Sequence, residues 1–110
     1  MTRLTLPTAV TDYFTLMAGA DKRATIDVFT ADARVADDGR TYAGRDEILG
    51  WLSTAASEYT VTTTRLGAET AGDTVTVSIR LDGNFPGGTV NLRNVFTLQG
   101  ALIGSLEIAP

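Results

Sequence analysis

Apolar residues in the first twenty positions recur at the spacing of an amphipathic helix. The stripe follows the i, i+3, i+4, i+7 rule, and its members are Val10, Tyr13, Phe14 and Met17. Pro7 suits the first turn of such a helix, since its missing N–H would be unpaired there, and Gly19 provides a stop. The pattern therefore predicts a helix that begins near Pro7 and buries one side.

Two further helical segments are predicted by the same criteria. Asp21 is a natural N-cap for a short helix, in which Ala24, Val28 and Phe29 face one way. A third helix is predicted after Gly44, and its apolar positions are Ile48, Trp51, Leu52 and Ala55. Its first turn carries Asp46 and Glu47, whose negative charges stabilise a helix N-terminus.

Between the second and third helices the apolar period changes to strict alternation. The inner set Ala33, Val35 and Asp37 alternates with Arg34, Ala36 and Asp38, which predicts a short strand. Asp38-Gly39 then predicts a two-residue turn of type I′, because such turns need positive φ at both central residues. Residues 40–42 form the predicted returning strand.

From residue 59 onward the chain predicts strands only, over 59–66, 74–81, 90–96 and 102–108. The clearest alternation places Val75, Val77, Ile79 and Leu81 on one face, and Val90, Leu92, Asn94 and Phe96 likewise. Gly72-Asp73 and Gln99-Gly100 are predicted turns, and residues 82–88 a loop or bulged hairpin.

This order of elements predicts an α+β fold, with three N-terminal helices packed on a curved antiparallel sheet. The helices cover one face of the sheet, so the other face must meet water or a second subunit. Its predicted members are polar but strand-forming: Thr74, Thr76, Ser78, Arg80, Asn91 and Arg93. We therefore expect a homodimer through the outer sheet face.

Composition removes several classes of function. The 110 residues fit a single domain, 1–110, and they include no cysteine and no histidine. Disulfides, thiol nucleophiles, Ser-His-Asp catalysis and ordinary zinc sites are thereby excluded. The net charge is −4 and the basic residues are scattered singly, which argues against nucleic acid as a partner. No apolar run is long enough to span a membrane, so we expect a cytoplasmic protein.

Residues 29–48 carry a pattern that resembles a known family. The segment runs from Phe29 through Ala33-Arg-Val35-Ala-Asp37-Asp-Gly39 to Gly44-Arg-Asp-Glu-Ile48, with Trp51-Leu52 after it. Together with Gly83-Asn-Phe85-Pro86 and the ending Leu106-Glu-Ile108, it resembles SnoaL-like members of the nuclear transport factor 2-like superfamily, which also contains the ketosteroid isomerases. The resemblance implies a cone-shaped α+β roll around an apolar pocket, and a dimer through the outer face of the sheet.

The same resemblance suggests roles for individual residues. Ketosteroid isomerase combines an aspartate base with an oxyanion hole of tyrosine and protonated aspartate. On that pattern Tyr13 takes the place of the oxyanion tyrosine and Asp37 that of the base, whereas the oxyanion aspartate falls on Leu92. Phe29 and Leu52 occupy the places of supporting tyrosines and cannot donate hydrogen bonds. Ketosteroid isomerase activity itself is therefore not expected.

The residues themselves leave two readings of each candidate open. In one interpretation Asp37 lies on the apolar inner face of its strand, where a desolvated carboxylate favours proton abstraction. In the other it is solvated at the open end of the hairpin. Tyr13 either polarises a substrate carbonyl or packs in the core. Asn94 is placed between Leu92 and Phe96 on the inner face, so its amide meets either a ligand or a buried partner. The expected pocket wall also includes Trp51, Val35, Val77 and Phe85.

Two functions remain. The first is a cofactor-independent isomerase, cyclase or dehydratase that acts on a small hydrophobic carbonyl compound by acid-base chemistry, with no metal. Asp37 is then the base, and Tyr13, with Asn94, holds the oxyanion. The second is a non-catalytic domain that binds a hydrophobic ligand or mediates dimeric interaction, which Leu92 in place of the third acid favours.

Overall fold

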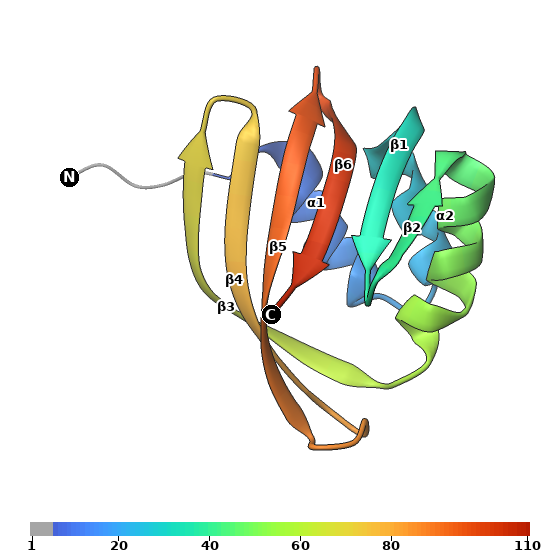
Figure 1. The fold of residues 1–110 in the computed structure, drawn as a ribbon, viewed down its shortest axis with the longest axis vertical. Coiled ribbons are helices and arrows are strands. Elements are labelled where there is room, and N and C mark those ends of the chain that lie inside the picture. Colours follow the sequence, from blue (N-terminus) through green and yellow to red (C-terminus); the bar gives the residue numbers. More distant parts are fainter. Residues whose placement is uncertain (1–5) are drawn as a thin grey trace.

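The computed structural model describes residues 6–110, which form helices on one side of a six-stranded sheet (Figure 1). The helical elements are α1 (Thr8–Met17), the 3-10 helix η1 (Lys22–Val28), α2 (Gly44–Ser53) and the 3-10 helix η2 (Ala55–Ser57). The strands are β1 (Phe29–Asp37), β2 (Arg40–Ala43), β3 (Val61–Ala71), β4 (Thr74–Gly83), β5 (Thr89–Gln99) and β6 (Leu102–Ala109). None of the helices described is long and apolar enough to cross a membrane.

The first helix agrees with its apolar stripe, since Val10 and Tyr13 are buried on α1. The second helical segment differs from the prediction because it is a 3-10 helix. Asp21 does cap it, with its carboxylate accepting the Arg23 N–H at 3.0 Å. At three residues per turn, Thr25 and Val28 share the buried side. Ala24, which was expected inside, is exposed.

The hairpin after η1 forms as predicted, although its first strand starts earlier. Phe29 opens β1 instead of closing a helix, and it is fully buried there. Asp38 and Gly39 have φ of 52° and 77°, so both central residues of the turn are left-handed. This is the type I′ conformation, whose twist suits the two flanking strands. The turn fixes Asp37 as the last residue of β1.

The strand order is β2-β1-β6-β5-β4-β3, so the four later strands make the predicted meander. The sheet is nevertheless mixed, because β1 and β6 run parallel, with Val35 opposite Leu106. This corrects the expectation of a purely antiparallel sheet. The hairpin pairs only one edge of β1, and β6 satisfies the hydrogen-bonding groups of its other edge.

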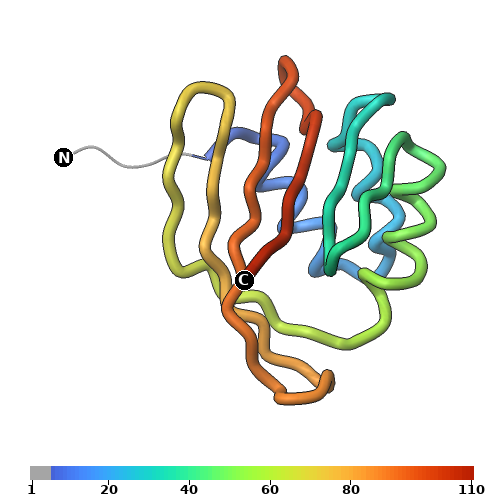
Figure 2. Tube along the Cα trace, viewed as in Figure 1, coloured from blue at the N-terminus to red at the C-terminus, as the bar shows by residue number. Residues whose placement is uncertain are grey.

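The helices cover the concave face unevenly. α2 contacts η1 and β1, whereas α1 contacts η1 and β6, so the helical layer lies over the β1–β6 half of the sheet (Figure 1). The prediction of three N-terminal helices is therefore only partly right, because η1 is a 3-10 helix; the third helix follows the hairpin, as its residues predicted. The connection between β4 and β5 extends beyond the rest of the sheet, as the tube in Figure 2 shows.

The core lies where the helices meet the sheet. Its largest fully buried side chains include Trp51, Phe29, Phe96, Ile48 and Leu52. On the outer face, Thr74, Thr76 and Ser78 are half-buried, and Arg80, Asn91 and Arg93 are exposed, as the alternation predicted.

Candidate functional site

A cavity of about 1180 Å³ lies between the inner face of the sheet and the helices. It is situated at the end of the sheet where β1 stops and the β4–β5 connection begins, toward the bottom of Figure 1. Its walls come from α1, η1, α2, η2 and all six strands. Its lining includes Tyr13, Phe14, Met17, Lys22, Asp37, Trp51, Ala56, Tyr59, Ile79, Leu81, Phe85, Leu92, Asn94 and Ile108.

Asp37 contributes a half-buried carboxylate to this cavity. The indole N–H of Trp51, on α2, donates to its Oδ2 at 3.0 Å. Between residues 6 and 110, no side chain or backbone group donates to the other oxygen, Oδ1. One oxygen of Asp37 is thus fixed by the protein, and the second is left for whatever occupies the cavity.

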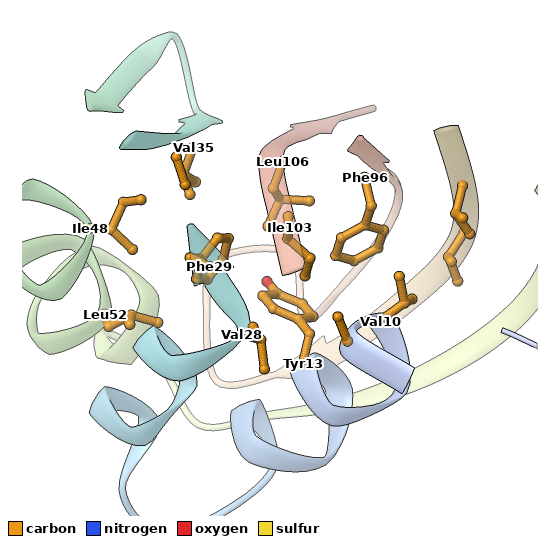
Figure 3. Packing of buried hydrophobic residues seen from close by; sticks show 14 of the residues in the cluster. Val10, Tyr13, Val28, Phe29, Val35, Ile48, Leu52, Phe96, Ile103 and Leu106 are labelled. Carbon is orange, nitrogen blue, oxygen red and sulfur yellow. The ribbon is translucent and has the colours of Figure 1, made fainter. Parts of the chain in front are cut away.

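Tyr13 places its ring in the core and lines the cavity with part of its surface. The ring, which is 3% exposed, makes edge-on contacts with Phe29 and Phe96 at centroid distances of 6.2 and 5.2 Å. In Figure 3 its hydroxyl oxygen lies on the far side of the ring from α1. Burial raises the pKa of Tyr13 far above its ordinary value, and the negative charge of Asp37 raises it further. The hydroxyl therefore remains protonated, and it lies within electrostatic reach of Asp37.

Asn94 supplies a buried amide from β5. It is paired across the sheet with Val77 of β4 and Ile108 of β6, and its side chain is 3% exposed. Its Oδ1 is buried without a hydrogen-bond partner among the described residues. A buried carbonyl oxygen left unpaired is costly, and because this oxygen is almost inaccessible, Asn94 lines the cavity with other atoms.

The remaining predicted wall residues divide into two groups. Leu92 and Phe85 are half-buried and line the cavity, and Phe85 packs edge-on against Tyr59 at 5.9 Å. Trp51 is 2% exposed and also lines it.

Val35, Val77 and Phe96 were expected on the pocket wall, and this expectation is corrected. All three are fully buried in the core and do not line the cavity. Alternation assigns a residue to the inner face, but it does not distinguish the part of that face under the helices from the part that borders empty space.

Two features of the site were not predicted from the sequence. One is the hydrogen bond from Trp51 to Asp37, which joins residues from a helix and a strand. The other is Lys22, a half-buried residue that lines the cavity and donates from Nζ to the Ala56 carbonyl at 2.7 Å. Burial lowers the pKa of this lysine. The sequence feature that could have pointed to this residue is that Lys22 is the only lysine in the sequence.

No group of three or more acidic side chains within residues 6–110 is arranged to hold a metal ion.

Comparison with known families agrees with this geometry. A family model for the SnoaL-like domain matches residues 10–103. The chain belongs to the SnoaL-like family. No curated protein matches this SnoaL-like chain in sequence.

Solved structures resemble this SnoaL-like domain over almost its whole length. A proposed polyketide cyclase from Sinorhizobium meliloti is 33% identical, with 94% of each chain covered and a TM-score of 0.87. A protein with a ketosteroid isomerase-like fold from Catenulispora acidiphila, solved in complex with trimethylamine, is 27% identical, with 96% of this chain and 87% of that chain covered and a TM-score of 0.85.

A third structure shares the fold alone. A Mycobacterium tuberculosis protein in complex with estradiol-17beta-hemisuccinate is 15% identical, with 91% of this chain and 88% of that chain covered and a TM-score of 0.75.

Proposed function

We propose that this SnoaL-like protein is a cofactor-independent isomerase, cyclase or dehydratase that acts on a small hydrophobic carbonyl compound. The proposal depends above all on how the two carboxylate oxygens of Asp37 are bonded. One of its oxygens is anchored by Trp51, and the other is unbonded at a cavity that Tyr13 and Asn94 also line. A positioned carboxylate beside hydrogen-bond donors is the arrangement that enolate chemistry requires.

In the proposed reaction, Oδ1 of Asp37 removes a proton from the carbon next to the substrate carbonyl. The C–H bond breaks, an O–H bond forms on the carboxyl group, and the electron pair moves onto the carbonyl oxygen. Tyr13 donates its phenolic hydrogen to that oxygen, and Asn94 can donate one from its amide nitrogen. The enolate then takes that proton back from Asp37 at another carbon. Alternatively, it attacks a second carbonyl carbon, whose oxygen takes the proton from Asp37, or it expels hydroxide, which takes the proton and leaves as water.

The comparisons support this choice of chemistry. The relative with 33% identity is itself a proposed polyketide cyclase, and polyketides are rich in carbonyl groups. The cavity volume, about 1180 Å³, is slightly above the range of about 300–1,000 Å³ that is usual for small-molecule sites. The walls supplied by Leu92, Phe85 and Trp51 are apolar, which suits a hydrophobic substrate.

Enolate formation can be tested without knowing the natural substrate. The probe is 2-tetralone, a bicyclic aromatic ketone, whose α-hydrogens exchange with deuterium in heavy water and are followed by NMR. The wild-type protein is expected to accelerate exchange above the buffer rate. Asp37→Asn should lower the catalysed rate by about 10²- to 10⁴-fold, because the amide cannot accept the proton.

Two further variants separate chemistry from folding. Trp51→Phe keeps an aromatic ring but removes the N–H bonded to Asp37 together with part of the indole ring, so it should lower the maximal rate about tenfold or more. Asp12→Asn removes an exposed carboxylate of α1 outside the cavity and should leave the rate unchanged. If Asp37→Asn exchanges as fast as wild type, Asp37 is not the base and the proposal fails.

A second candidate function is ligand binding without catalysis. It is favoured by Leu92, which lines the cavity with an apolar side chain where the ketosteroid isomerase pattern has an acid. For a pure binding protein, 2-tetralone would bind and shift the NMR signals of cavity residues, but its α-hydrogens would exchange at the buffer rate.

A further inference from the structure

Lys22 differs from the other basic residues in its surroundings. It begins η1, is half-buried and lines the cavity. Among residues 6–110, its Nζ donates a hydrogen bond to the neutral carbonyl oxygen of Ala56 in η2, at 2.7 Å. An ammonium group has three N–H bonds, so two remain after this contact.

No carboxylate neutralises this ammonium within the described residues. The one ion pair among residues 6–110 joins Arg80 and Asp82, on the exposed end of β4. The acid next to Lys22 in sequence, Asp21, uses its side chain to cap η1 through the Arg23 N–H. A partly desolvated cation without a counter-ion is unfavourable in the empty site, and an anionic group would relieve that cost.

We propose that Lys22 binds a carboxylate group of the ligand at the end of the cavity bounded by η1 and η2. This inference rests on the proposed function for its site and narrows the substrate class to hydrophobic carbonyl compounds that also carry one carboxylate. A single ammonium with two free N–H bonds matches a single negative charge, whereas a phosphate dianion needs more cations.

The charge of Asp37 determines which end of the cavity the ligand carboxylate occupies. A ligand carboxylate beside Asp37 would be repelled by the charge of that residue, which stays in the cavity through its bond to Trp51. The ligand carboxylate therefore lies at Lys22, and the reactive carbonyl lies at Asp37, Tyr13 and Asn94. Lys22 acts as a specificity determinant and takes no part in the proton transfer.

The test compares two probes that differ only in charge. 2-Naphthylacetate and its neutral amide, 2-naphthylacetamide, are titrated by calorimetry into wild type, Lys22→Gln and Lys22→Arg. We expect wild type to bind the carboxylate about tenfold more tightly than the amide. Lys22→Gln should abolish that preference while it leaves amide binding unchanged, and Lys22→Arg should keep most of it.

A merely structural lysine would behave differently. If its role were only the bond to Ala56, Lys22→Gln would weaken both probes equally, and this outcome overturns the proposal, as does equal binding of the two probes by wild type. 2-Naphthyl phosphate is titrated as a third probe. Tighter binding of the phosphate than of the carboxylate would overturn the choice of a carboxylate.

The single lysine allows a second readout that does not depend on affinity. Expression with ¹³C-labelled lysine marks Lys22 and leaves its three N–H bonds intact, and the NMR signal of its Cε carbon reports its titration. A carboxylate bound at the ammonium stabilises the charged form, so 2-naphthylacetate should raise the labelled Lys22 pKa and the amide should not. An unchanged titration overturns the proposal.

Failure here is distinguishable from failure of the proposed function. The exchange of 2-tetralone, a neutral ketone, is measured on the wild-type protein and tests Asp37 independently of Lys22. If the wild-type protein catalyses exchange of 2-tetralone but shows no preference for the carboxylate probe, the proposed enolate chemistry stands. Only the proposal of a ligand carboxylate at Lys22 is then refuted.

Discussion

At the scale of single residues, the three polar groups assigned to the proposed reaction are held in different ways. Asp37 is anchored through one oxygen by Trp51, Tyr13 is fixed by the rings around it, and Asn94 has a carbonyl oxygen with no partner. The first two are preorganised, since their positions do not depend on a ligand. The Asn94 side-chain oxygen, by contrast, is not held by a hydrogen bond from the described residues.

The buried hydroxyl of Tyr13 makes stability depend on pH in the alkaline range. Its pKa is raised from 10.0 in the unfolded chain, so above that pH the unfolded chain loses a proton that the folded protein keeps. The contribution of Tyr13 to stability is therefore complete below pH 10.0 and is lost as the pH rises toward the folded pKa. Urea midpoints measured on either side of pH 10.0 should fall with increasing pH.

Tyr13→Phe should flatten this alkaline decline, because phenylalanine has no proton to lose. The same substitution at Tyr42, a half-buried residue beside Trp51, serves as the matched control and should leave the decline in place. An equally steep decline in Tyr13→Phe would show that other groups cause it.

At the scale of elements, the sequence predicted what depends on local spacing and missed what depends on long-range pairing. The stripe on α1, the Asp38-Gly39 turn and the four-strand meander follow from helical period, positive φ and alternation. The parallel partner of β1 lies near the other end of the chain, so no local pattern indicates it. In the same way, Asn94 was placed on the inner face, but the bond from Trp51 to Asp37 needed the tertiary structure.

Gly83, at the end of β4, has no room for a side chain. A Cβ atom at Gly83 would lie 2.5 Å from the Thr60 carbonyl oxygen and 2.8 Å from Cγ1 of Val61. Gly83→Ala should therefore lower the free energy of unfolding by about 1–3 kcal/mol, because the start of β3 must move. Chemical denaturation measures the effect.

Gly67 of β3 provides the control for this prediction. A Cβ atom there would meet no heavy atom within 4 Å, so Gly67→Ala should change stability by less than about 0.5 kcal/mol. Equal destabilisation by the two substitutions would mean that the contact with Thr60 does not determine the cost.

At the scale of the whole molecule, the outer face of the sheet remains a predicted dimer interface. Thr76 of β4 pairs with Val95 of β5 near its centre, and both are half-buried in the single chain. Sedimentation at micromolar concentration should give a dimer, and Thr76→Arg should shift it to monomer by placing a charge in the interface. Thr11→Arg, on the exposed side of α1, should remain dimeric, and a wild-type monomer would refute the prediction.

The parallel pairing of β1 with β6 also bears on how the chain reaches its native state. β1 and β2 are synthesised early, yet β1 stays unpaired along one edge until β6 arrives with residues 102–109. Bringing Val35 to Leu106 closes a loop of most of the chain, which slows folding in proteins dominated by such distant contacts. On the ribosome, the hairpin of β1 and β2 and the meander that begins at β3 therefore remain separate units. β6 is the strand that joins them, so completion of the cavity belongs to the last step of folding.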